Sequence, residues 1–286
     1  MIVIEASGGL GNQMFQYALY KKLEFMGKDV FFDTSFFRSK WSNRELELGV
    51  FDVQYRSILD KDVAFIRGYG YQDSLIDKMK YKMKPSKFIV YKDIIEKVQP
   101  EIMMMDNVYL SGYWQSEKYF KDIRDIILQE FSFPEEIKKR ATDLCERIKE
   151  ENSVSLHVRR SDYLTEQNIK LYGNICNEKY YKSAMDYMES QVNKLHYYVF
   201  TDDLQWANAY FIGDKYTIVD GNRGKDSWVD MYLMSQCKHN IIANSTFSWW
   251  GAWLNQNDNK IVVSPSKWFN TYDAQDIICN EWVRVN

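Results

Sequence analysis

Two arginines beside a histidine and an aspartate form the string of this sequence that is best suited to binding a phosphate. The string runs from His157 to Asp162, reads HVRRSD, and follows the strand-like run 154–158. An arginine at the mouth of a strand can donate two parallel hydrogen bonds to a phosphate. The structural alternative is an Arg160–Asp162 ion pair beside a core histidine. Taken as a whole, the string favours function, and we treat His157, Arg159, Arg160 and Asp162 as candidate site residues.

A second polar string begins a predicted helix. Asn244, Ser245, Thr246 and Phe247 follow the strand-like run 241–243 and lead into a helix expected over 247–254. The first amides and hydroxyls of such a helix face an anion favourably, and the helix dipole adds to this. Alternatively, Asn244 or Ser245 is simply the N-cap of the helix. Capping and phosphate binding are compatible, so all four residues are candidates for binding an anionic ligand.

Three further predicted strands also end in small or ionisable residues. Asp202 and Asp203 follow the run 197–200, residues 220–222 (DGN) follow 217–219, and residues 264–265 (SP) follow 261–263. In an open parallel sheet, ligands bind beyond the carboxyl ends of the strands. Five polar strand ends in succession therefore predict one polar crevice, with Asp202 as a candidate within it.

A glycine-rich loop near the amino end resembles a dinucleotide-binding loop only in part. The residues from Gly8 to Gln13 read GGLGNQ, but Met14 occupies the third glycine position and no Walker lysine follows. This disfavours a dehydrogenase or a P-loop enzyme. The loop still permits close backbone approach to a ligand at Gly11, with Asn12 at the start of a helix.

Composition and residue spacing disfavour a metal protein and a nucleic-acid-binding protein. The 286 residues carry a formal net charge of −3, whereas proteins that bind nucleic acid are normally basic. The four cysteines are far apart and form no CxxC pair. The pair Asp60 and Asp62 has DxD spacing but lies in a polar stretch, and we expect it to form a solvated turn. If a nucleotide diphosphate binds, arginine and helix amides must replace a metal ion.

Alternating strands and helices position these residues. In the first part we expect strands at 2–6, 30–32 and 108–110, helices at 12–26 and 117–130, and loops with short helices over 38–92. Pro134 precedes a charged helix expected over 135–151, so we place the domain boundary there, giving domains 1–134 and 135–286. The second domain adds helices at 178–192, 204–210 and 227–237 between its strands. This alternation predicts an α/β fold with parallel sheets.

The amino end begins directly with a strand-like run, MIVIEA, and lacks a basic start or a long apolar stretch. This is unlike a signal peptide. The sequence contains no apolar run of 18 residues that would suggest a membrane span. We therefore expect a cytoplasmic protein.

Several strings together resemble those of glycosyltransferase family 11, the α-1,2-fucosyltransferases. They are GGLGNQMFQYA from Gly8, YLSGYWQSEKYF from Tyr109, HVRRSDY from His157, FTDD from Phe200, NSTFSWWGAWL from Asn244 and PSKW from Pro265. The resemblance spans nearly the whole chain. The first and third strings also resemble the wider superfamily of α-1,6- and protein O-fucosyltransferases.

The resemblance implies a fold, a donor and residue roles. The fold is the B-type glycosyltransferase fold, in which two Rossmann-like domains face a cleft. The first domain serves the acceptor and the second binds GDP-fucose without a metal ion or other cofactor. Arg159 would contact the β-phosphate and the departing oxygen, and His157 would position the nucleotide. Asp202 would lie near guanosine, and Asn12 would reach the donor phosphate; Ser245, Thr246 and Phe247 would line the phosphate and the base.

The implied reaction is inverting transfer of L-fucose to the 2-hydroxyl of a terminal β-galactose on a glycan, as in a lipopolysaccharide. Asp162 is a candidate general base, or the residue that orients Arg159. Peripheral contact with the inner membrane surface is a further expectation. The alternatives are a fucosyltransferase of another linkage, a transferase for another nucleotide sugar, a non-catalytic nucleotide- or carbohydrate-binding protein, and a phosphate-binding hydrolase.

Overall fold

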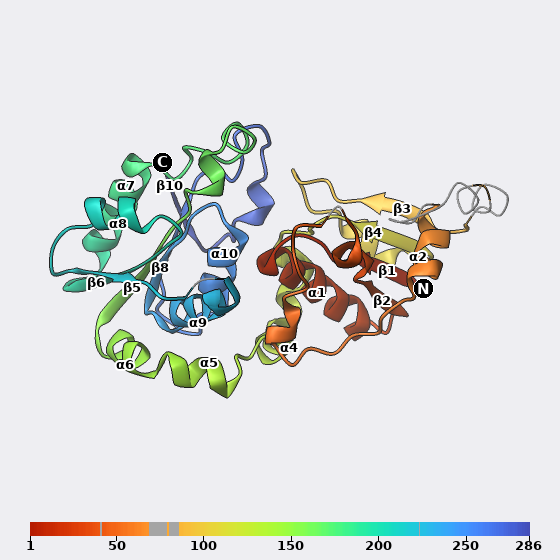
Figure 1. The fold of residues 1–286 in the computed structure, drawn as a ribbon, viewed down its shortest axis with the longest axis horizontal. Coiled ribbons are helices and arrows are strands. Elements are labelled where there is room, and N and C mark those ends of the chain that lie inside the picture. The colour runs from red at the N-terminus through yellow and green to blue at the C-terminus, as the bar shows by residue number, and fades with distance from the viewer. Residues whose placement is uncertain (41, 69–78, 80–85, 223) are drawn as a thin grey trace. The chain divides into compact units, whose positions relative to one another are not determined.

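Two compact units make up the chain, as the computed structural model shows for residues 1–40, 42–68, 79, 86–222 and 224–286. The units are Met1–Ser132 and Phe133–Asn286, a division close to the boundary expected after residue 134. Each unit contains a parallel sheet with helices packed against it (Figure 1). The predicted α/β fold class is therefore confirmed.

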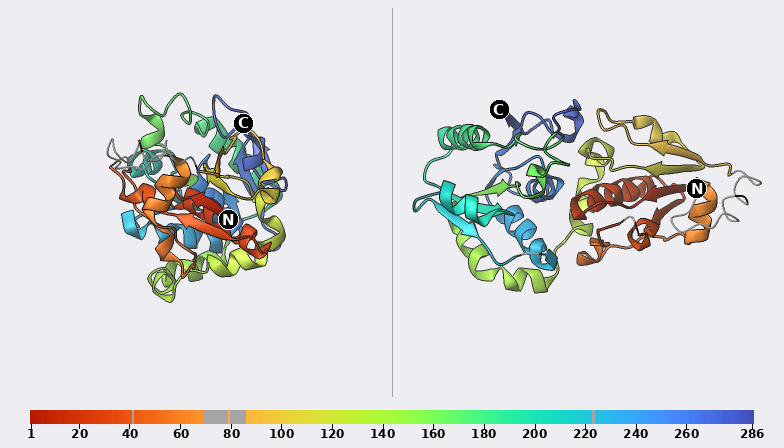
Figure 2. Two further views of the ribbon diagram at one scale, coloured as in Figure 1. Left: turned by 90° about the vertical axis from the view of Figure 1, so that its right-hand side faces the viewer. Right: turned by 45° about the horizontal axis from the view of Figure 1, so that its top comes forward.

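The N-terminal unit is built on a four-stranded parallel sheet with strand order β2-β1-β4-β3. The strands are β1 (Ile2–Glu5), β2 (Val30–Asp33), β3 (Ile89–Lys92) and β4 (Val108–Ser111). Helix α1 (Leu10–Phe25) lies along this sheet (Figures 1 and 2) and buries most of its side chains. The unit also contains α2 (Asp60–Arg67) and α4 (Arg124–Glu130).

Three predictions for this unit need correction. Asp60 and Asp62 form the first turn of α2, where their charges suit the helix dipole, and not a solvated turn. The helix expected over 117–130 begins as two 3₁₀ turns, because Phe120 has φ −142° and ψ 7° and interrupts the helix. Strand β3 lies in the stretch expected to be irregular, of which residues 41, 69–78 and 80–85 lie outside the described residues.

The C-terminal unit is built on a six-stranded parallel sheet with strand order β10-β9-β8-β5-β6-β7. Its strands are β5 (Asn152–Val158), β6 (Leu195–Thr201), β7 (Tyr216–Val219), β8 (His239–Ile241), β9 (Val262–Pro265) and β10 (Val283–Val285). Its helices are α5 (Glu135–Arg140), α6 (Thr142–Glu150), α7 (Glu178–Gln191), α8 (Leu204–Tyr210), α9 (Ser227–Gln236) and α10 (Thr246–Trp253).

The two faces of β5 pack against different helices. Val154, Leu156 and Val158 join the buried cluster that includes α7 residues such as Tyr181. Because side chains alternate along a strand, Ser155 and His157 project to the opposite face. There Asn240 donates hydrogen bonds to the Ser155 hydroxyl and to the backbone carbonyl of Met234 in α9.

Three predictions for this unit also differ from the structure. The helix expected over 135–151 is split at Ala141, where the Thr142 hydroxyl donates to the carbonyls of the preceding turn and competes with the helix ladder. Strand β8 ends two residues earlier than expected, although Ile242 and Ala243 are just as buried. Ser264 and Pro265 belong to β9 itself and not to a loop after it.

No helix among the described residues is both long enough and apolar enough to span a bilayer.

Candidate active site

The two strings singled out by sequence flank one point in the larger sheet. Strand β5 pairs with β6 on one side and with β8 on the other, so the strand order reverses at β5 and β8. Ligands of open α/β sheets bind at the carboxyl ends of the strands at such a point. Residues 157–162 start at the end of β5 and continue beyond it, and residues 244–247 come shortly after the end of β8. The sheet topology therefore brings these two strings to the position where a ligand is expected.

Arg159 is held by two carboxylates. Its Nε lies 2.9 Å from Asp162 Oδ1 and its Nη2 lies 2.9 Å from Asp162 Oδ2, while Asp202 Oδ2 lies 3.3 Å from Nε. Desolvation lowers the pKa of the guanidinium, but the charges of Asp202 and Asp162 outweigh this and raise it above its ordinary value. Within the described parts of the chain, Nη1 has no protein partner. The side chain is thus fixed in direction, with one nitrogen available to a ligand.

His157 is a buried imidazole whose Nδ1 has no hydrogen-bond partner among the described residues. Burial, and to a lesser extent the charge of Arg159, lowers its pKa to about 3, so the ring is neutral. The ring lies 6.0 Å from that of Phe247, the second residue of α10. Buried polar atoms are rarely left unpaired in folded proteins. His157 Nδ1 is therefore an exception to this rule within the described residues.

The amino end of α10 has no side-chain cap hydrogen bond. Ser245 is the N-cap residue, with φ −130° and ψ 127°, yet its hydroxyl makes no cap hydrogen bond. The first amides of a helix have no partner within the helix, and the helix dipole favours an anion there. Thr246 and Phe247 are partly exposed. The predicted anion-binding character of this helix start is thus compatible with its geometry.

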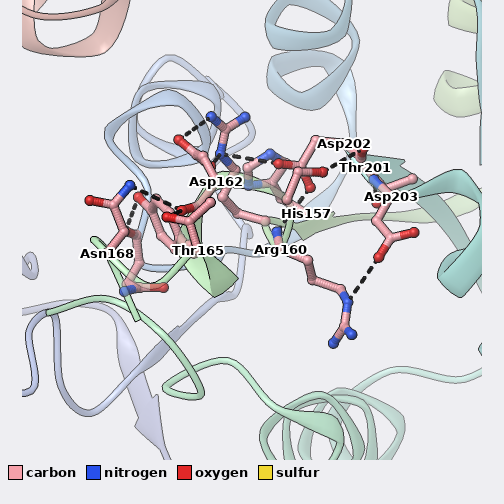
Figure 3. Close-up of polar contacts among 12 residues, drawn as sticks. His157, Arg160, Asp162, Thr165, Asn168, Thr201, Asp202 and Asp203 are labelled. Atoms are coloured by element: carbon pink, nitrogen blue, oxygen red, sulfur yellow. Dashed lines mark hydrogen bonds and ion pairs between the residues drawn. The ribbon is translucent and has the colours of Figure 1, made fainter. Parts of the chain in front are cut away.

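Arg160 turns away from Asp162 and toward Asp203, as Figure 3 shows, with its Nε 3.2 Å from Asp203 Oδ2. Its guanidinium also stacks on the ring of Trp206, 4.3 Å from the ring centroid. Its backbone N–H donates to Asp202 Oδ1 over 2.9 Å. The Arg160–Asp162 pair considered as the structural alternative is therefore wrong, because Asp162 pairs with Arg159.

Asn244 is almost fully buried and connects several loops. Its Nδ2 donates to the backbone carbonyls of Tyr172 (3.3 Å) and Trp268 (3.1 Å), and its Oδ1 accepts from the Cys176 thiol (3.5 Å). Its own backbone carbonyl accepts from the Tyr163 hydroxyl over 3.0 Å. With its side chain engaged in this way, Asn244 positions the neighbouring loops.

The glycine loop belongs to the N-terminal unit. Gly8 has φ +77°, and a Cβ atom on it would lie 2.6 Å from Asn12 Nδ2, so only glycine fits. Gly11 is buried inside α1, and the Asn12 carboxamide oxygen accepts from Gln115 Nε2 over 2.7 Å. Glu47 Oε2 accepts from the backbone N–H of Leu10 over 3.1 Å. A carboxylate of the protein itself thus caps α1, a contact that the sequence pattern did not predict.

Asp230, a carboxyl group in helix α9, was not among the residues expected from the sequence. Asn222 Nδ2, beyond the end of β7, donates to Asp230 Oδ1 over 2.8 Å. Desolvation, and secondarily the charge of Asp220, raises the pKa of Asp230 to about 7, although the hydrogen bond from Asn222 opposes this. Perturbed carboxyl groups near strand ends are candidates for ligand binding. The sequence signal that was available is the aspartate inside the apolar run WVDMYLM.

In the described residues, no three His, Cys, Asp or Glu side chains gather as potential metal ligands. Fold and site together define an α/β protein with a paired arginine, Arg159, at the end of β5 and a helix start, that of α10, shortly after the neighbouring strand β8.

Comparison with known proteins identifies the family. The chain matches the model of Glycosyl transferase family 11 over residues 1–286 and belongs to this family. It is 33% identical over 302 residues to the O-antigen biosynthesis glycosyltransferase WbnK of Escherichia coli, covering 98% of both chains. It is 31% identical over 294 residues to an alpha-1,2-colitosyltransferase of Escherichia coli, covering 100% of this chain and 99% of that one.

A third relative comes from a primate. Galactoside alpha-(1,2)-fucosyltransferase 1 of Leontopithecus chrysomelas is 26% identical over 190 residues, which cover 62% of this chain and 52% of that protein. The resemblance drawn from the sequence strings is thus confirmed at the level of the family. The protein is a glycosyltransferase, a class whose members use a sugar donor and a glycan acceptor.

Proposed function

We propose that this glycosyltransferase moves L-fucose from GDP-fucose to the 2-hydroxyl of a terminal β-galactose on a glycan, with inversion and without a metal ion. One observation carries the proposal: Arg159, fixed by two carboxylates, lies at the β5–β8 switch point with one nitrogen unpaired. A pyrophosphate needs cationic and N–H donors, and this crevice supplies both.

The donor would be held mainly by the C-terminal unit. The β-phosphate would contact Nη1 of Arg159 and the first amides of α10, beside Ser245 and Thr246. His157 Nδ1 would gain its missing partner from the nucleotide, with Phe247 against the base. Asp202 would lie near guanosine, and Arg160 would add positive charge. From the N-terminal unit, Gly11 and Asn12 would approach the donor phosphate.

The chemistry would be a single displacement. The acceptor oxygen bonds to the anomeric carbon of β-linked GDP-fucose from the opposite face, its proton is released to water, and the bond to the GDP oxygen breaks, giving an α-linkage and free GDP. Negative charge grows on the departing oxygen as the sugar gains oxocarbenium character. A preorganised guanidinium stabilises that charge without having to reorganise. Because Asp162 uses both oxygens to hold Arg159, it acts in this proposal as the orienting residue and not as the base.

The experiment that tests the proposal is a panel of glycan acceptors incubated with GDP-fucose. GDP release that depends on a β-galactose acceptor, with an α-1,2 product linkage assigned by NMR, is the expected result. Release without an acceptor would indicate a hydrolase, and GDP binding without release a non-catalytic binding protein. An α-1,6 or O-fucosyl product would overturn the linkage. Calorimetry with GDP, UDP and ADP should show tight binding of GDP alone.

A second candidate reaction is transfer of colitose, which lacks the 3-hydroxyl of fucose. The observation that favours it is the 31% identity, over the full length, to a colitosyltransferase. The same panel run with a nucleotide-linked colitose decides between the two sugars. Whichever donor gives the higher kcat/KM is the substrate.

The proposed enzyme would act in the cytoplasm, with peripheral contact at the inner membrane surface. Fractionation of cells that produce the protein tests this location. Recovery from membranes after a high-salt wash would argue against a loosely held peripheral protein.

A further inference from the structure

A pocket of about 320 Å³ opens beside Arg159, and residues of the C-terminal unit alone line it. Its walls include Arg159, Tyr163, Tyr172, Cys176 and Asn244, and Leu164, Asn174 and Lys179 stand at its exposed rim. Most of these residues come from the segment that joins β5 to α7. The roles proposed above account for Arg159, whereas the pocket itself has no assigned occupant.

The pocket walls are fixed to one another through Asn244. The Tyr163 hydroxyl donates to its backbone carbonyl (3.0 Å), the Cys176 thiol donates to its Oδ1 (3.5 Å), and its Nδ2 donates to the Tyr172 carbonyl (3.3 Å). Buried hydrogen bonds of this kind hold side chains in a single arrangement. The shape of the pocket is therefore set by the unit's own packing.

A tight bend at residues 173 and 174 shapes the rim. A Cβ atom on Gly173 would lie 2.6 Å from Ile169 Cγ1 and 2.8 Å from the Ile169 carbonyl oxygen, so only glycine fits there. Asn174 follows with φ 61°, a left-handed conformation that asparagine tolerates better than most residues. Asn270 Nδ2 donates to the Gly173 carbonyl over 2.9 Å and fixes the bend. Asn174 is thereby placed at the pocket mouth.

The pocket is lined both by apolar surfaces and by hydrogen-bond donors. The rings of Tyr163 and Tyr172 stack with centroids 4.9 Å apart and an interplanar angle of 21°, and Cys176 and Leu164 add further apolar surface. Arg159, Asn174 and Lys179 supply N–H donors. A 6-deoxyhexose has a matching surface, because it carries a methyl group and an apolar ring face together with several hydroxyls.

We infer that this pocket is the subsite for the transferred 6-deoxyhexose of the donor. The inference rests on the proposed function, in which Arg159 contacts the β-phosphate. The sugar is bonded directly to that phosphate, so it must lie in the space next to Arg159. Asn174 then acts as a specificity residue that donates a hydrogen bond to a sugar hydroxyl. Tyr163 and Tyr172 form the wall against the apolar part of the ring.

The test compares the affinities of GDP and GDP-fucose, measured by calorimetry without an acceptor, in two variants of the full chain. Leu164→Trp fills the pocket from its rim, and Asn174→Gly removes the carboxamide while keeping the left-handed bend. Ile212→Trp, at a residue that is 77% exposed and lies outside the pocket, controls for the added indole. Lys194→Gly, at φ 54° and also outside the pocket, controls for a glycine at a left-handed position.

We expect Leu164→Trp to weaken GDP-fucose binding about tenfold or more and Asn174→Gly about fivefold, the value of one hydrogen bond. Neither should alter the affinity for GDP, and neither control should alter the ratio of the two affinities. An unchanged ratio in both variants overturns the inference. So does an equal loss for GDP, which would make the pocket a nucleotide site. If the wild-type protein binds neither ligand, the proposed function fails instead.

Discussion

Both carboxylate oxygens of Asp162 lie 2.9 Å from nitrogens of Arg159, and this pairing fixes the guanidinium at the carboxyl end of β5. Asp202 adds a third contact from the end of β6. Two carboxylates reduce the positive potential of the arginine but hold its direction. The residual attraction for a phosphate would then come from Nη1 together with the amides of α10.

Replacing Arg159 tests this arrangement directly. We expect Arg159→Ala to lower kcat about 10²- to 10³-fold, because the charge on the departing oxygen loses its partner. Arg159→Lys should recover only part of this loss, since lysine lacks the planar fork. Turnover is measured with saturating GDP-fucose, and circular dichroism checks the fold. Arg140→Ala, at an exposed arginine paired with Asp226, is the matched control. Near-normal turnover of Arg159→Ala would refute the assignment.

Asp162→Asn separates an orienting role from a basic one. If Asp162 only orients Arg159, Asp162→Asn should lower kcat/KM about tenfold, and the acidic limb of the pH–rate profile should stay at the same pH. Asp203→Asn, at the carboxylate paired with Arg160, serves as the comparison. If the acidic limb disappears from the Asp162→Asn profile, Asp162 is the general base and the orienting role is wrong.

Chelation tests the metal-free mechanism. We expect full activity after dialysis against excess EDTA, and no stimulation when Mg²⁺ or Mn²⁺ is added back, because arginine and helix amides would supply the electrostatic stabilisation. The measurement is GDP release in the presence of acceptor. A chelated enzyme that regains activity only with a divalent ion would contradict this expectation.

Asp230 predicts an unusual dependence of stability on pH. Its pKa is raised to about 7 in the folded protein, against an ordinary value of 3.8, so the folded state holds the proton more tightly than the unfolded state. The contribution of this group to stability is therefore fully present below about pH 4 and is lost as the pH rises toward 7. Asp230→Asn should raise the free energy of unfolding by about 1–2 kcal/mol at pH 8, a value discounted for partial exposure, and by nothing at pH 4.

Urea unfolding at the two pH values measures this effect. Asp226→Asn is a control with the opposite expected effect on the free energy of unfolding at pH 8. The hydrogen bond with Arg140 lowers the pKa of the Asp226 carboxyl group, so its charged form stabilises the fold and its replacement should lower that free energy. Equal destabilisation of Asp230→Asn at both pH values would mean that the protein needs the carboxylate itself.

Asn244→Ala should destabilise the C-terminal unit. The change leaves the carbonyls of Tyr172 and Trp268 without their donor, at a cost of about 1–3 kcal/mol each when they stay buried. We expect the thermal midpoint to fall by several degrees. Asn208→Ala removes an exposed side-chain hydrogen bond to the Leu204 carbonyl and should have little effect. A midpoint equal to that of the wild type would exclude Asn244 as a structural connection.

Local sequence patterns were sufficient to predict the α/β class and most helices and strands. They were also sufficient to single out the strings around Arg159 and Asn244. Short-range periodicity and turn residues decide these features, and they are visible in one sequence. The ends of β8 and β9 were missed, because residues just beyond a buried strand can be as apolar as the strand itself. The split of the helix at Ala141 depends on one hydroxyl that competes for backbone carbonyls.

The amino-acid sequence alone determined the family and the residue types at the end of each central strand. Only the tertiary structure decided which of them pair: Asp162 with Arg159, Asp203 with Arg160, and Asn244 with the loop around Tyr172. Strand order and side-chain direction set these pairings, and both arise from contacts between residues far apart in the chain. The pocket beside Arg159 and the raised pKa of Asp230 have the same origin, since each depends on burial that no local pattern encodes.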